Sequence, residues 1–66
     1  MKAKVFIQIK GAIESKSLYE CVKDMGLNVT DLGDTTLVYG DCPDDELSAL
    51  VSICWSFGDV VIEITQ

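Results

Sequence analysis

Hydrophobic and polar positions follow two different periods along this chain, and each period predicts a type of element. Residues 4–10 alternate with period two, which is typical of a half-buried strand. Residues 18–25 carry apolar side chains at helical spacing, with Ser15 or Ser17 as the cap and Gly26 as the end. Residues 27–31 and 35–39 flank a turn signal at Gly33 and are rich in β-branched residues, so they predict an antiparallel hairpin.

A longer helix is predicted from Pro43 to Phe57, followed by a last strand over 60–65. Pro43 suits a first helical turn, Asp41 or Cys42 can cap it, and the acidic residues that follow complement the helix dipole. The apolar arc of this helix is wide and extends to Trp55. Trp55 either reaches the sheet rim and the other helix, or forms part of a contact surface for another protein, where aromatic anchors are enriched.

The element order β-α-β-β-α-β predicts one α+β domain over residues 1–66 with a ferredoxin-like fold. Right-handed crossovers place both helices on one face of a four-stranded antiparallel sheet with strand order 4-1-3-2. The other face of the sheet is expected to be open to water.

Charge is distributed unevenly along the 66 residues. The net charge is −6 with a pI near 4.1, and all five cations are lysines within residues 1–23. Residues 24–66 contain nine carboxylates and no cation. This pattern argues against direct binding to nucleic acid or an anionic membrane, because phosphate groups are bound by Lys and Arg. It favours a basic protein as partner, although an acidic surface that serves solubility alone is the alternative.

No combination of residues predicts catalysis, a metal site or a cofactor. The chain has no histidine, which excludes Cys–His zinc sites and histidine-activated nucleophiles. The acidic residues at 41 and 44–46 could offer oxygen ligands to a cation, but consecutive helical residues point in different directions. Of the three cysteines, Cys21 and Cys54 lie on apolar stripes and are predicted to be core residues. Cys42, at a predicted helix start, is expected to react first.

Localisation is predicted from what the sequence does not contain. No apolar run reaches the length of a membrane-spanning helix, and Gln8 and Lys10 interrupt the N-terminal apolar run too early for a signal peptide. A cytoplasmic protein is therefore expected, in the host cytoplasm if the source is a phage.

Three resemblances bear on function. Phe6 and Tyr39 are similar to the sheet aromatics of the RNA-recognition motif, but the Lys/Arg-Gly-aromatic run of that family is missing. The element order, with Gly11 after the first strand and the run 25–29 entering the second, is similar to ACT domains. That resemblance implies a small-molecule-binding regulatory module that acts as a homodimer. The profile as a whole, a solitary acidic domain without a catalytic set, resembles small phage-encoded inhibitors such as anti-CRISPR proteins, some of which mimic DNA.

The leading hypothesis is a non-enzymatic acidic inhibitor that blocks the nucleic-acid-binding surface of a basic protein, as a monomer or a homodimer. The ACT-like module is the alternative. The residues predicted to contact the partner are the clustered carboxylates and one aromatic anchor: Asp31, Asp34, Asp41, Asp44, Asp45, Glu46, Asp59 and Trp55.

Overall fold

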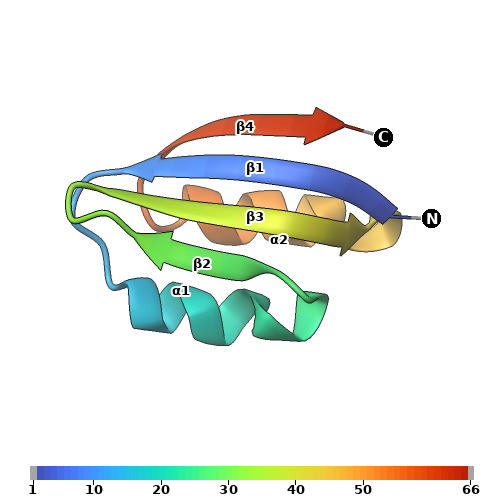
Figure 1. Cartoon of the computed structure of the whole chain (residues 1–66), viewed down its shortest axis with the longest axis horizontal. Coiled ribbons are helices and arrows are strands. Elements are labelled where there is room, and N and C mark those ends of the chain that lie inside the picture. Colours follow the sequence, from blue (N-terminus) through green and yellow to red (C-terminus); the bar gives the residue numbers. More distant parts are fainter. Residues whose placement is uncertain (1, 66) are drawn as a thin grey trace.

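A computed structural model of the chain describes residues 2–65, and its elements follow the order predicted from the sequence (Figure 1). Two short 3₁₀ helices, η1 and η2, accompany the α-helices. The elements in chain order are β1 (Lys2–Lys10), α1 (Ser15–Val22), η1 (Lys23–Met25), β2 (Asn28–Asp31), β3 (Thr35–Pro43), η2 (Asp44–Glu46), α2 (Leu47–Trp55) and β4 (Asp59–Thr65).

The four strands form one open antiparallel sheet in the order β2-β3-β1-β4. The predicted order 4-1-3-2 is the same order read from the opposite edge, so the α+β class and the sheet order are confirmed. The central strand β1 pairs with β3 on one side and with β4 on the other, and Phe6 lies opposite both Tyr39 and Glu63. Because paired residues in an antiparallel sheet share a face, these three side chains lie on the same side.

The apolar core lies between one face of the sheet and both helices. Val5, Ile7 and Ile9 alternate along β1 toward this face and are buried. The buried cluster also contains residues of both helices and of β3, namely Leu18, Val22, Val38, Leu50 and Cys54. Both helices therefore cover the same face, and the opposite face of the sheet carries no helix (Figure 1).

The predicted start of the second helix is wrong. β3 continues through Pro43, which pairs with Lys2, and α2 begins only at Leu47 after η2. Proline disfavours helical dihedrals in the residue before it, so Cys42 is extended, and β1 is long enough to pair with it. Pro43 itself has φ −56° and ψ 138° and precedes η2, and neither Asp41 nor Cys42 caps a helix.

Two predictions about the cysteines are also wrong. Cys42 is completely buried, because the alternation of β3 points it to the core opposite Ala3. Cys21 is exposed, because the buried stripe of α1 is narrow and consists of Leu18 and Val22. The burial of Cys54 is confirmed. The prediction that Ser15 or Ser17 caps the first helix is wrong as well: the residue before α1 is Glu14, and no side chain makes a capping hydrogen bond.

Gly40 shapes the centre of β3. Its φ of +137° is a conformation that residues with a side chain rarely adopt. A Cβ atom at this position would lie 3.2 Å from Leu27 Cδ2, on the helix-covered side of the sheet. The glycine therefore lets the segment before β2 pack closely on β3, next to the open-face residues Tyr39 and Asp41.

Candidate functional site

The predicted carboxylates lie in two groups at opposite ends of a molecule 32 Å long. Lys10 pairs with both Thr35 and Asp59, so the β2–β3 turn and the start of β4 lie at one end. We call this the hairpin end, and it carries Asp31, Asp34 and Asp59. Lys4 pairs with Asp41 near the other end, where β3 leads into η2 (Figure 1). We call this the η2 end, and it carries Asp41, Asp44, Asp45 and Glu46.

Asp31 has a structural role at the hairpin end. One carboxylate oxygen accepts a hydrogen bond of 2.8 Å from the backbone N–H of Gly33, which closes the turn between β2 and β3. The other accepts a hydrogen bond of 3.0 Å from Ser15 Oγ at the start of α1. Asp34 and Asp59 are exposed. Asp31 therefore stabilises the turn through its hydrogen bonds, whereas Asp34 and Asp59 are free to contact another molecule.

The η2 end is the denser group of carboxylates. Asp41, Asp44 and Asp45 are exposed and Glu46 is half-buried. The pKa of the neighbouring Cys42 thiol is raised, mainly because the thiol is buried. The negative charges of Glu46, Asp45 and Asp44 raise this pKa further. Within residues 2–65 the one ion pair joins Lys23 to Glu20 at 2.8 Å, and it involves none of these groups.

Trp55 is exposed over 62% of its surface and does not contribute to the buried cluster. It follows Leu47 and Val51 at helical spacing, so the three residues share one flank of α2. The interpretation that Trp55 reaches the sheet rim does not account for this exposure. The side chain is available as an anchor for another molecule.

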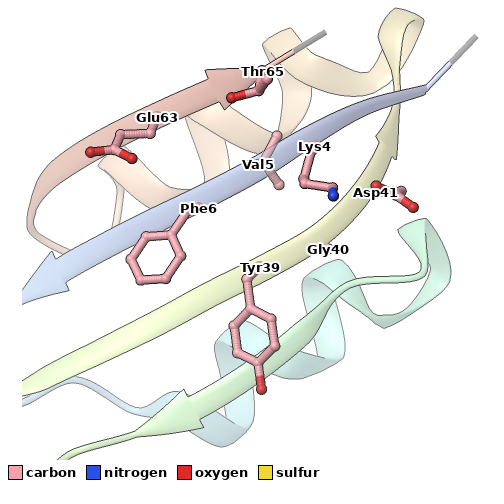
Figure 2. Close-up of a pocket in the computed structure, with 8 residues that line it drawn as sticks. All are labelled: Lys4, Val5, Phe6, Tyr39, Gly40, Asp41, Glu63 and Thr65. Atoms are coloured by element: carbon pink, nitrogen blue, oxygen red, sulfur yellow. The ribbon is translucent and has the colours of Figure 1, made fainter.

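A hollow on the open face of the sheet was not predicted from the sequence. It has a volume of about 470 Å³ and lies over β1, β3 and β4 (Figure 2). The rings of Phe6 and Tyr39 form its apolar part, and the Thr30 hydroxyl fixes the phenol of Tyr39 through a hydrogen bond of 3.1 Å. Lys4, Asp41 and Glu63 supply charges of both signs around it. The alternation of the two central strands is the signal that puts both rings on one face.

The described residues show no group of side chains arranged to bind a metal ion. In the range 2–65 no three or more His, Cys, Asp or Glu side chains are placed so that they could hold one metal ion. Every buried side-chain nitrogen or oxygen atom within that range has a hydrogen-bond partner. No helix of the described chain is long and apolar enough to cross a membrane.

Comparison with known proteins found no match to a family model, to a curated protein or to a solved structure. The features of this chain that bear on function are therefore the two acidic ends, the exposed Trp55 and the hollow of the open face.

Proposed function

We propose that this chain is a non-enzymatic acidic protein of ferredoxin-like fold that works in the cytoplasm. It binds a basic protein and prevents nucleic acid from binding to that protein's surface. The strand order, the two helices on one face and the helix-linked crossovers support the ferredoxin-like assignment. The resemblance to small phage-encoded inhibitors, including DNA mimics, gives the expected type of target.

One observation carries the proposal: residues 24–66 hold nine carboxylates and no cation, and eight of the nine side chains are exposed. Duplex DNA presents about one charge per 1.7 Å of its axis, and proteins bind it with clusters of Lys and Arg. A rigid scaffold with clustered carboxylates presents the same sign of charge to such a cluster. The η2 end, with three exposed carboxylates and Glu46, is the docking end. Trp55 lies at the other end of α2, toward the hairpin end, so it is the apolar anchor for a partner that extends along α2.

The test is competition by DNA. The immobilised protein is exposed to a cell lysate at low salt, and captured proteins are eluted with duplex DNA. We expect nucleic-acid-binding proteins to be captured and to be displaced by DNA and by salt, because exposed charges are screened over about 8 Å at physiological ionic strength. The double variant Asp44→Asn with Asp45→Asn should reduce capture.

The matched control is Asp34→Asn with Asp59→Asn, which removes two charges from the hairpin end. It should leave capture nearly unchanged. If DNA displaces nothing and neither double variant changes what is captured, the acidic surface serves solubility and the inhibitor function is wrong.

The hollow of the open face favours a second function, the ACT-like small-molecule module. Its volume of about 470 Å³ lies in the usual range of ligand pockets. Its two rings and its charges of both signs suit a zwitterionic ligand such as a free amino acid. The test is the melting temperature in the presence of single amino acids. If one of them raises the melting temperature of the parent but not of Tyr39→Ala, the ligand-binding function is favoured over the inhibitor function.

A further inference from the structure

The two edges of the sheet differ in how well they are protected. An edge strand leaves a row of backbone N–H and C=O groups unpaired. Proteins usually protect such an edge with charged side chains, most often lysine, with proline, with a short length or with a cover. The edge strand β2 has four residues and packs against α1. The edge strand β4 has seven residues, contains neither lysine nor proline, and pairs with β1 alone (Figure 1). Its two charged residues are Asp59 at its start and Glu63 on the open face, and neither points toward the core.

Apolar side chains accompany this free edge. Val61 is exposed over 45% of its surface on the open face, and Ile64 over 43% on the helix-covered face. Val60 and Ile62 are half-buried. In Figure 1, α2 lies behind β1 and β3, and β4 extends beyond it. The helices therefore leave the outer part of β4 uncovered on both faces.

We propose that β4 pairs with β4 of a second copy of this chain, through a two-fold axis perpendicular to the sheet and centred on Ile62. This arrangement is antiparallel, and it keeps the helices of both copies on one side of a continuous eight-stranded sheet. Ile62 is the middle residue of the strand Asp59–Thr65, so all seven residues of each copy are paired.

Repulsion between carboxylates also favours the register centred on Ile62. With the axis at Ile62, Glu63 lies opposite Val61 of the other copy, and Asp59 lies opposite Thr65. An axis at Val61 would place Asp59 opposite Glu63, and an axis at Glu63 would place the two Glu63 carboxylates opposite each other. Like charges directly opposite each other destabilise a sheet. Of these three registers, only the one centred on Ile62 avoids such a pair, and it also gives the longest ladder.

The resulting junction is apolar on the side of the helices. Val60 lies opposite Ile64, and the two Ile62 side chains meet on the axis, so each copy covers the exposed Ile64 of the other. The two Glu63 residues remain diagonal neighbours, with Cα atoms about 7–8 Å apart. Their repulsion weakens the dimer, and added salt or Glu63→Gln should therefore tighten it.

The first experiment measures the oligomeric state of the full chain by sedimentation equilibrium over a series of concentrations. We expect a reversible dimer. Ile64→Lys adds an inward-pointing charge at the edge and should weaken dimerisation at least tenfold. The matched control is Leu32→Lys in the β2–β3 turn, where the side chain is exposed over 58% of its surface. Circular dichroism checks that both variants fold.

The second experiment tests the register by disulfide trapping in a Cys21→Ser background. Residues directly opposite in antiparallel strands have Cα atoms about 4.5–5.5 Å apart, which a disulfide spans. Ile62→Cys should therefore cross-link two copies rapidly under mild oxidation. Val61→Cys is the control, because its side chain is more exposed but its two copies lie on a diagonal, beyond disulfide reach.

Three results would overturn the proposal. The first is a parent protein that stays monomeric at every concentration. The second is an equal loss of dimer in Leu32→Lys and Ile64→Lys. The third is cross-linking of Val61→Cys as fast as that of Ile62→Cys, which would indicate random collision or another register.

Discussion

The three cysteines differ in how far they are buried. Cys42 and Cys54 are completely buried, on β3 and α2, whereas Cys21 is exposed on α1. Burial raises the pKa of the Cys54 thiol to about 11. Burial also raises the pKa of Cys42, with a further contribution from the carboxylates of the η2 end. Since the thiolate is the reactive form, both effects protect the buried pair from reagents.

Cys21 should therefore react first with a thiol reagent. Brief labelling of the native protein followed by mass spectrometry should find the label on Cys21, with Cys42 and Cys54 labelled only after denaturation. Cys21→Ser is the control and should remain nearly unlabelled. Rapid labelling of Cys42 would mean that β3 does not hold it in the core.

The raised pKa of Cys54 predicts a loss of stability at alkaline pH. Below pH 9.0, the ordinary pKa of the thiol, both the folded and the unfolded state keep the proton, so there is no contribution. Between pH 9.0 and about 11 the unfolded state loses its proton while the folded state keeps it, so the free energy of unfolding falls. One pKa unit corresponds to about 1.4 kcal/mol, so the loss approaches about 2–3 kcal/mol.

Chemical denaturation at pH 8 and pH 10.5 measures this effect in the parent and in Cys54→Ala. The variant should be less stable at pH 8 because it leaves a small cavity, but it should lose less stability on going to pH 10.5. Other groups titrate equally in both proteins and cancel in the comparison. Parallel pH profiles would contradict the assignment to Cys54.

Among the connections between elements, the carboxylate of Asp31 joins the β2–β3 turn to the start of α1. Asp31→Ala removes both hydrogen bonds and should lower the free energy of unfolding by about 1–2 kcal/mol. Asp34→Ala is a matched control in the same turn, because the Asp34 carboxylate makes no hydrogen bond within residues 2–65, and it should cost less than about 0.5 kcal/mol. Urea denaturation compares them, and equal losses would show that the hydrogen bonds do not matter.

The sequence predicted the type and order of the elements better than their ends. Period-two alternation identified β1 and β4, and the turn at Gly33 identified the hairpin, because these signals are local. The end of β3 was missed because pairing with Lys2 and Ala3 extends the strand to Pro43. That pairing is a tertiary effect, which Pro43 and its acidic neighbours do not reveal.

At the scale of the whole molecule, the candidate sites show the same division between local and tertiary information. The composition indicated that many carboxylates would be exposed. It did not indicate which of them would form hydrogen bonds that stabilise the fold. Asp31 turned out to fix a turn. The hollow was missed because it needs Phe6 and Tyr39 from two strands, the Thr30 hydroxyl from a third and Glu63 from the fourth. Only the register of the sheet brings these residues together.

The two proposed interactions respond to salt with opposite signs. Binding to a basic partner joins unlike charges, so salt should weaken it. Pairing of β4 with a second copy brings two chains of net charge −6 together, so salt should strengthen it. A single titration with NaCl, read by sedimentation with and without a captured partner, therefore separates the two interactions.

The central position of β1 also determines how the chain can fold. The hairpin of β2 and β3 joins neighbours in sequence, but β1 must pair with β3 and with the distant β4, where Lys4 meets Thr65. Contacts between residues far apart in sequence slow folding, because the loop entropy is lost before the pairing is gained. We therefore expect the pairing of β1 with β4 to form late in folding. Until it forms, β1 exposes the same kind of unpaired edge that β4 presents in the folded chain.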